Sequence, residues 1–448
     1  MDGLTRRQAL TATAAAAGAA ALAGAGPAAG SGRRRLGGDG DHGGGHGPKR
    51  VAPPLTLTGA NLFDPDSGRV TERATIVFEN GVVRRAGRGE RPASGERVID
   101  VGGAFVLPGL IDAHVHAATV AAAQLALQRG ATTVRSASTA FFQDVGLEAM
   151  AEVGGLGVPR VLPAGLFVTP NLGDSILADP ALAPLALLPD GVRRPEDLAF
   201  VTRVNIARGA RVIKTRSTER AGLPEQDPRV QVYDARQIGA VVDAARKLPG
   251  GVLCHGHGDE GVRDSIIAGV RSVEHGTFAS AATLDLMRRR GTFLTPTVSA
   301  VIDLAAPGGE YTDPRLVERG REMLATLRVT VQAAFARGIP IAAGTDTAYT
   351  TASLSSVVTE IKALAGLGLP KLAALRAATT VNASLLARDR EIGRLRPGYA
   401  ADAVVVGANP LDDLAALDDI RLIVAGGWLA REGTTAAATP AAADPEGD

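Results

Sequence analysis

The chain has 448 residues, enough for one large domain with a smaller one, or for an α/β barrel with an appendage. Its 48 basic and 47 acidic side chains almost cancel, which argues against a nucleic-acid or membrane-surface partner. A single cysteine excludes an intrachain disulfide, and the low aromatic content of 3% requires a core of small and aliphatic side chains.

The first 30 residues have the features of an export signal. Arg6 and Arg7 precede a weakly hydrophobic run, residues 12–25, which small residues follow. We therefore expect residues 1–30 to be a twin-arginine signal peptide, read by the twin-arginine export machinery, and the protein to be periplasmic or extracellular. The run is too short and too rich in Ala and Gly for a membrane span, so no stable membrane anchor is expected. The alternative is an Ala-rich N-terminal helix of a cytosolic protein.

Residues 31–54 consist mainly of Gly, Arg, His and Pro and show no apolar periodicity. Such a segment cannot bury enough apolar surface to offset its ordering entropy, so we predict a disordered linker. His42 and His46 within it are interpreted as polar filler rather than as metal ligands. A disordered tail is predicted for residues 433–448.

Short β-type runs occur at both ends of the remaining sequence. Turn pairs separate them, among which Asn80-Gly81 is a strong hairpin signal. The pattern predicts a small β-sandwich domain that residues 55–107 and 396–432 build together. The runs that carry this prediction are 56–58, 74–78, 81–83, 97–101, 402–406 and 421–427.

Between these ends, residues 108–395 alternate apolar strands with segments of helical periodicity, for example 234–247, 259–268 and 316–337. Eight such strand–helix units predict an α/β fold, a closed (β/α)8 TIM barrel rather than an open sheet. The predicted strands are 110–114, 131–135, 160–168, 211–214, 251–254, 271–275, 292–298 and 339–344.

Candidate metal ligands follow these predicted strands. The strand at 110–114 ends in His114-Val115-His116, and alternate residues of a strand face the same side, so both imidazoles are offered to one cation. The carboxyl ends of barrel strands meet at one rim, where catalytic residues lie, so side chains there are expected to form a metal site. The further candidates at strand ends are Lys214, His255, His257, His275 and Asp346.

This arrangement resembles the metal-dependent amidohydrolase superfamily, and more narrowly its imidazolonepropionase-like branch, which includes Xaa-Pro and Xaa-Arg dipeptidases. The narrower likeness is carried by residues 255–261, 268–276 and 344–346. A C-terminal signature of the branch is also present, at residues 377–379 and 392–402.

The resemblance implies a centre of two divalent ions, taken to be two zinc ions per chain. The implied ligands are His114, His116 and Asp346 for the first ion, His255 and His275 for the second, and Lys214 between them. Lys214 would be an N6-carboxylysine, since carboxylation converts an unfavourable ammonium into a bridging anion. The alternative for Lys214 is an ordinary amine paired with an acid. His257 is not a ligand in most of the branch, so a catalytic role through substrate or second-shell contact is expected.

The implied reaction is hydrolysis of an amide or cyclic amide bond, in a small dipeptide or N-acyl compound. A hydroxide bridging the ions would attack the carbonyl, and Asp346 would move the proton to the leaving group. Two alternatives stay open: a lactone, ester or phosphotriester hydrolase, and a mononuclear deaminase on the same fold. A non-catalytic scaffold is disfavoured because the ligand set is complete. The oligomeric state is also open, a homo-oligomer being one alternative.

The chain departs from the branch in two places. The common aspartate after the second strand is replaced in Thr132-Thr133-Val134-Arg135-Ser136, which removes no ligand but alters a second-shell contact. Residues 170–195 form a long Leu-, Ala- and Pro-rich segment without the Gly-Gly-His type of loop, so the substrate is not fixed by the resemblance. Cys254 faces away from His255 on the pleat and is interpreted as core rather than as a nucleophile.

Overall fold

The computed structural model describes residues 49–92, 96–306 and 311–432. The signal peptide predicted at 1–30, residues 31–48 of the linker with His42 and His46, and the tail predicted at 433–448 lie outside the described residues. Residues 49–54, the end of that linker, contain no helix or strand. Within the described ranges, no helix has the length and apolar character needed to cross a membrane.

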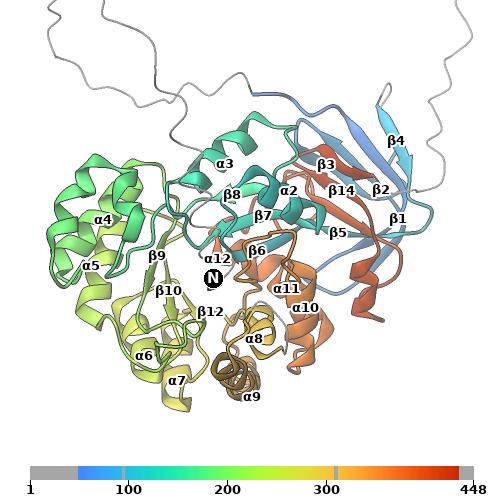
Figure 1. Ribbon diagram of the computed structural model, residues 1–448. Helices are drawn as coiled ribbons and strands as arrows, with labels where there is room; N and C mark the ends of the chain where they lie inside the picture. Colours follow the sequence, from blue (N-terminus) through green and yellow to red (C-terminus); the bar gives the residue numbers. More distant parts are fainter. Residues whose placement is uncertain (1–48, 93–95, 307–310, 433–448) are drawn as a thin grey trace, which may run out of the picture. The chain divides into compact units, whose positions relative to one another are not determined.

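Strands from both ends of the chain form one mixed sheet, in which the blue and red strands of Figure 1 lie side by side. Its order is β15-β14-β13-β5-β1-β2-β3, and β4 pairs with β1. Strands β5 and β13 join the two ends, with Leu107 opposite Val404 and Val106 opposite Val405. The strands are β1 (Leu55–Phe63), β2 (Val70–Glu79), β3 (Val82–Arg88), β4 (Arg97–Asp100), β5 (Phe105–Pro108), β13 (Ala403–Val406), β14 (Ile420–Ala425) and β15 (Trp428–Glu432).

The turn between β2 and β3 follows directly from its sequence. Glu79 pairs with Val82 across Asn80-Gly81, and both turn residues have positive φ angles, 55° and 77°. A type I′ hairpin turn requires positive φ at both positions, which Asn and Gly adopt at low cost. The hairpin predicted at Asn80-Gly81 is confirmed.

The predicted sandwich is present only in part. The two chain ends do combine, and their apolar side chains, such as Leu57, Ile76, Val405 and Leu422, share one buried cluster. However, among the described residues these strands belong to one sheet rather than to two packed sheets. The reason is that β1 pairs with β2 on one side and with β4 and β5 on the other, so hydrogen bonding continues from end to end.

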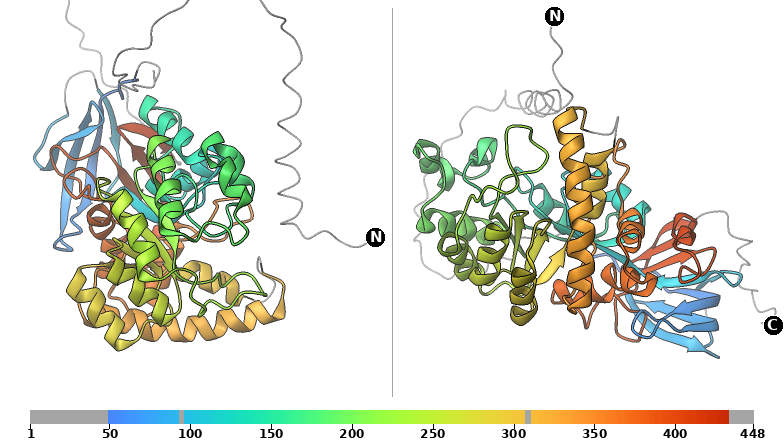
Figure 2. Two further views of the ribbon diagram at one scale, coloured as in Figure 1. Left: turned by 90° about the vertical axis from the view of Figure 1, so that its left-hand side faces the viewer. Right: turned by 90° about the horizontal axis from the view of Figure 1, so that it is seen from below.

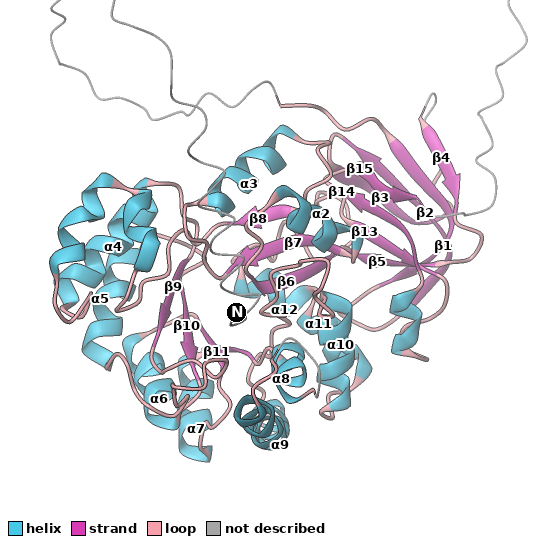
Figure 3. Cartoon of the chain, viewed as in Figure 1, coloured by secondary structure: helices cyan, strands magenta, loops and turns pink. Residues whose placement is uncertain are grey.

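The middle of the chain forms two parallel sheets, which Figure 3 shows in magenta. One has the order β6-β7-β8 and the other β12-β11-β10-β9, and every neighbouring pair is parallel. This arrangement confirms the α/β class. The strands are β6 (Leu110–Val115), β7 (Ala131–Ser136), β8 (Arg160–Leu162), β9 (Ile213–Arg216), β10 (Val252–Gly256), β11 (Ser272–His275) and β12 (Phe293–Thr295).

The structure differs from the expected closed barrel. Where the ends of the two parallel sheets meet neighbouring segments, single bridges take the place of continuous strand pairing. Val168 bridges to Thr215 between the two sheets, and Val115 bridges to Thr347. The eighth strand predicted at 339–344 is not a strand, and only Ile341 forms a bridge there, to Leu294. Ala342 donates its N–H to Leu294 O but Ala343 donates to Ala377 O, and Pro340 has no N–H, so the donors of this segment do not form a continuous ladder with one strand.

Helices follow the parallel strands as the periodicity predicts. Helices α5 and α6 pack on β9, β10 and β11, and α9, the long helix of Figure 2, has 23 residues. The helices are α2 (Val120–Gln128), α3 (Gln143–Val153), α4 (Pro195–Ala207), α5 (Ala235–Ala245), α6 (Asp259–Ala268), α7 (Ala281–Arg290), α8 (Val298–Ala305), α9 (Pro314–Ala336), α10 (Val357–Gly366), α11 (Lys371–Ala377) and α12 (Thr380–Leu385). The 3-10 helices are η1 (Gly173–Ala178), η2 (Pro180–Leu187) and η3 (Leu414–Asp418).

Capping side chains fix the start of the predicted helices. Asp234 accepts from the backbone N–H of Gln237 at the start of α5, and the Gln237 side chain returns the bond, which makes a capping box. Asp313 caps α9 in the same position, just before Pro314. The helices predicted at 234–247, 259–268 and 316–337 therefore agree with α5, α6 and α9 to within two residues.

Candidate metal centre

Parallel strands bring the candidate ligands together at their carboxyl ends. His114 is the second-last residue of β6, and His116 follows that strand. His255 lies near the end of β10, and His275 ends β11. Lys214 lies in β9, which begins two residues later than predicted, because Arg211 and Val212 direct their N–H groups to Pro163 O instead. All six predicted ligands thus meet at one site.

His114, His116 and Asp346 form the first group, whose ligand atoms lie within 4.8 Å of one another. Oδ1 of Asp346 lies 3.3 Å from Nε2 of His114 and 3.1 Å from Nε2 of His116. Burial opposes ionisation of Asp346, but the two histidines hold the pKa of its carboxyl well below the ordinary value. Asp346 is therefore an anion, able to bind a cation or to accept a proton.

Lys214 adjoins the first group. Its Nζ lies 3.1 Å from Nε2 of His114, and the residue is only 2% exposed. Burial lowers the pKa of the Lys214 ammonium to about 8, although Glu274 and Asp346 oppose this shift. Among the described residues, no carboxylate forms an ion pair with Lys214; its polar contact there is with the imidazole of His114.

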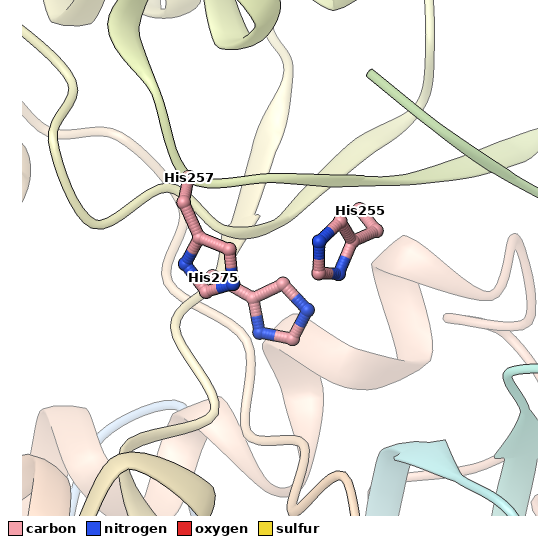
Figure 4. Close-up of side chains that lie close together, drawn as sticks. All are labelled: His255, His257 and His275. Atoms are coloured by element: carbon pink, nitrogen blue, oxygen red, sulfur yellow. The ribbon is translucent and has the colours of Figure 1, made fainter. Parts of the chain in front are cut away.

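His255, His257 and His275 form the second group, shown in Figure 4. The rings of His255 and His275 have their centroids 4.5 Å apart, and His257 stacks on His275 at the same separation. Burial lowers the pKa of all three imidazoles, that of His257 to about 3, so the three are neutral and have lone pairs for a cation. His257, expected to contact substrate, is thus also within reach of an ion in this group.

The two groups adjoin each other. The ring centroids of His114 and His275 are 5.5 Å apart, so the first and second groups meet across these two imidazoles. Lys214 contacts His114 on the first side. The site therefore contains five imidazoles, one carboxylate and one buried amine in a single cluster.

Each imidazole is also bonded through a ring nitrogen to an oxygen of the surrounding structure. Such a bond fixes the ring orientation and the tautomer and leaves the other nitrogen for a cation. The pairs are His114 Nδ1 with Glu274 Oε2 (2.6 Å), His116 Nδ1 with Ser138 O (3.1 Å), His255 Nε2 with Glu219 O (2.9 Å), His257 Nδ1 with Thr277 Oγ1 (2.9 Å) and His275 Nδ1 with Thr297 Oγ1 (2.7 Å).

The backbone is unusual at the site. His275 and Asp346 have positive φ angles of 75° and 55°, and so do Ser138 (107°) and Thr297 (50°), which orient His116 and His275. Residues other than Gly rarely adopt positive φ, at a cost of about 1–3 kcal/mol each, and such strain is concentrated at functional sites. Asp112 supports this backbone, because it accepts hydrogen bonds from Thr345 and from the N–H of His114.

Several of these partners were absent from the sequence-based expectations. Glu274 and Arg135 are the main examples: both are charged residues within predicted parallel strands, which are buried on both faces, and this is the signal that could have identified them. Ser136, at the altered position after the second strand, accepts from the N–H of Ser138, whose carbonyl oxygen in turn contacts His116. Ser136 is thus linked to His116 through Ser138.

Two further expectations concern Cys254 and the segment 170–195. Cys254 is fully buried and bonded to Ser265 Oγ at 3.2 Å, and burial raises the pKa of its thiol to about 11, in line with a core role. The segment 170–195 contains η1 and η2. It follows Phe167, whose ring centroid lies 5.6 Å from Nζ of Lys214. This segment therefore begins next to the cluster.

The donor set fits divalent metal ions. Neutral imidazoles and a carboxylate are the ligands that zinc and similar ions prefer, and both three-residue groups are compact enough to hold one ion each. The hydrogen bonds to the outer nitrogens match those usual for metal-bound histidines.

Comparison with known proteins agrees with this chemistry. Residues 105–429 match the model of the amidohydrolase family. The ochratoxinase of Aspergillus niger is 28% identical over 282 residues, which is 61% of this chain and 56% of the ochratoxinase, so the match spans about half of that relative.

Two of the solved structures that are similar to this chain are a Xaa-Pro dipeptidase and an ochratoxinase. A Xaa-Pro dipeptidase with methionine bound in its active site is 26% identical, with a TM-score of 0.73, and the match covers 85% of this chain and all of the other. The structure of Aspergillus niger ochratoxinase has 23% identity and a TM-score of 0.70, with 86% and 96% covered, a likeness of fold alone.

Proposed function

The chain belongs to the amidohydrolase family, and on that premise we propose that it is a metal-dependent hydrolase of an amide bond. The observation that carries the proposal is the cluster of five imidazoles, Asp346 and Lys214, which lie on the parallel strands or on the segments that follow or adjoin them. The substrate we propose is a small dipeptide or N-acyl amino acid. The ochratoxinase and the Xaa-Pro dipeptidase among the similar proteins support this class.

We propose that two zinc ions occupy the centre. His114, His116 and Asp346 would hold one ion, His255 and His275 the other, and Lys214 would bridge them as an N6-carboxylysine. The amine of Lys214 has a lowered pKa of about 8, so about a tenth of it is neutral at pH 7 and available to add CO2, far more than for an ordinary lysine. When bound, such ions polarise the substrate carbonyl and lower the pKa of water.

We assign the transfer of the proton to Asp346 and a hydrogen bond to the substrate to His257. The carboxylate of Asp346 is ionised, so it can take the proton of the attacking water and deliver it to the leaving nitrogen. His257 is neutral and lies beside His255 and His275, where it can donate a hydrogen bond to a substrate oxygen. The water adds to the carbonyl carbon, the C–N bond breaks, and an acid and an amine leave.

The bridges between the parallel sheets support a further part of the proposal, a (β/α)8 arrangement of these strands. Val168–Thr215, Leu294–Ile341 and Val115–Thr347 each continue the parallel pairing from one segment to the next. Such an arrangement would account for the common location of the ligands, since strands of that fold direct their carboxyl ends to one rim.

A substrate screen tests the function. Purified protein loaded with Zn²⁺ is assayed against dipeptides, N-acyl amino acids, cyclic amides, lactones and phosphotriesters, with chelator-stripped protein as the matched control. We expect turnover of an amide and its loss on stripping. Hydrolysis of esters, lactones or phosphotriesters alone, release of ammonia from an aminated base, or full activity without metal would contradict the proposal.

A further inference from the structure

A buried charged network lies next to His114 and outside the ligand groups. Arg135 in β7 donates to both carboxylate oxygens of Glu274 in β11, at 2.9 and 3.0 Å. Oε2 of Glu274 lies 2.6 Å from Nδ1 of His114. The side chains of Arg135 and Glu274 are both 0% exposed. The network therefore joins the two parallel sheets through side chains that have no contact with solvent.

Arg135 is connected to His114 both through the backbone and through the Glu274 side chain. Its Nε donates to the carbonyl oxygen of Ala113, the residue before His114. Its Nη1 donates to Ser272 Oγ at 3.0 Å, and Ser272 in turn donates to Glu274. Because a guanidinium presents its donors in a rigid plane, these bonds fix the Glu274 carboxylate relative to the backbone next to His114. The imidazole can then bond to Glu274 in only one orientation.

His114 differs from the other site histidines in its outer partner. Among the five imidazoles of the site, only that of His114 has a carboxylate as the partner of the ring nitrogen bonded to the surrounding structure; Ser138, Glu219, Thr277 and Thr297 offer neutral carbonyl or hydroxyl oxygens to the rest. A carboxylate partner increases the basicity of the imidazole and so its affinity for a cation. A buried carboxylate also requires a counter-charge, and Arg135 supplies it.

We propose that Arg135 is a positioning residue, which orients His114 through Glu274 and so strengthens metal binding by the His114–His116–Asp346 group. The inference rests on the metal centre proposed above. It assigns to Arg135 a role in the affinity of one ion, distinct from contact with substrate.

Metal binding without turnover tests this role. Chelator-stripped protein is titrated with Co²⁺, whose visible absorption reports binding, and equilibrium dialysis counts the ions. We expect Arg135→Met and Glu274→Gln to weaken the binding of one ion by about 10–100-fold, the usual effect of losing such a partner. Arg135→Lys keeps the charge but lacks the planar guanidinium, so its affinity for that ion should be intermediate between those of these variants and of wild type.

A double-mutant comparison separates positioning from general support of the fold. In a His114→Ala background, Arg135→Met should change Co²⁺ affinity no further, because the side chain through which it acts is gone. The matched control is Arg394, whose Nε and Nη2 each donate to one carboxylate oxygen of Asp66 at 2.8 Å, on a loop outside the cluster. Arg394→Met should lower the stability of the fold but leave Co²⁺ affinity unchanged.

Three results would overturn the inference: unchanged affinity in Arg135→Met and Glu274→Gln, an equal loss in the His114→Ala background, or an equal loss in Arg394→Met. Glu274→Gln preserves shape, so it tests the role even where Arg135→Met does not fold. Wild-type protein that binds no Co²⁺ would overturn the proposed metal centre and this inference together. If wild-type protein binds Co²⁺ and the variants bind it with the same affinity, the inference is overturned and the metal centre is not.

Discussion

Nζ of Lys214 and Nε2 of His114 are 3.1 Å apart, and both side chains are buried. An ammonium in that place would compete with any cation held by His114. Burial lowers the pKa of Lys214 to about 8, which favours the neutral amine that adds to CO2, with loss of one proton. The contact therefore supports the proposed carboxylation of Lys214.

Replacing Lys214 by Ala should abolish most of the activity and reduce the number of bound zinc ions, because the bridge is lost. Formate or propionate should restore part of the activity by occupying the vacated space. Elemental analysis gives the number of bound ions, and rates measured with and without formate or propionate at constant pH test the rescue. Lys362→Ala, which removes a surface ion pair with Asp418, is the control. Two ions and normal turnover in Lys214→Ala would contradict the two-metal centre.

Asp346→Asn should preserve the fold but lower turnover by about 10²–10⁴-fold, since an amide cannot accept the proton. The rate is measured on a substrate from the screen, and circular dichroism verifies the fold. Asp313→Asn at the start of α9 removes a carboxylate outside the site and should retain the wild-type rate. A rate above about one tenth of wild type would exclude Asp346 as the general base.

His257→Asn distinguishes a substrate contact from a third ligand. If His257 contacts substrate, the variant still binds two ions through the other groups, and kcat/KM falls. Dialysis against Zn²⁺ gives the number of bound ions, and steady-state kinetics give kcat/KM. Loss of one ion would instead make His257 a ligand together with His255 and His275.

Glu360 predicts a pH-dependent stability. It is fully buried and accepts from the backbone N–H groups of Val298 and Ser299 at the start of α8. Burial raises the pKa of its carboxyl to about 7, and Asp112 adds to the shift. Between its ordinary pKa and about 7, the folded protein binds more protons than the unfolded chain, so this contribution to stability falls as pH rises.

The comparison with Glu360→Gln, which does not titrate, isolates this effect. The free energy of unfolding of wild type minus that of the variant should fall by about 2–3 kcal/mol between pH 5 and pH 8. Urea unfolding of chelator-stripped proteins measures it. A difference that is constant or increases with pH would show that Glu360 has no raised pKa in the folded protein.

Export by the twin-arginine route is proposed from Arg6 and Arg7, which precede a weakly hydrophobic run. Replacing both by Lys keeps the charge but removes the planar guanidinium groups that a receptor reads. The variant should stay in the cytoplasm at full length, folded and active, whereas wild type is exported. Cell fractionation decides: an exported double-lysine variant would indicate another route, and a cytoplasmic wild type would mean that no signal is present.

The sequence alone determined the features that depend on short spacing. His114 and His116 are recognisable because residues two apart on a strand share a side, and Asn80-Gly81 because two residues with positive φ make the hairpin turn. The positions of Lys214 and His275 followed from apolar runs that end in a polar side chain. Local pattern therefore gave the α/β class and the ligand candidates.

Only the tertiary structure decided the features that join distant residues. Arg135 and Glu274 are 139 positions apart and meet because β7 and β11 face each other across the site. Likewise, the pairing of β5 with β13 made one sheet of two chain ends, and the segment at 339–344 formed a single bridge, at Ile341, instead of a strand. The physical reason is that buried charges and backbone donors must find partners wherever the packed chain supplies them, and no local spacing records which residues those are.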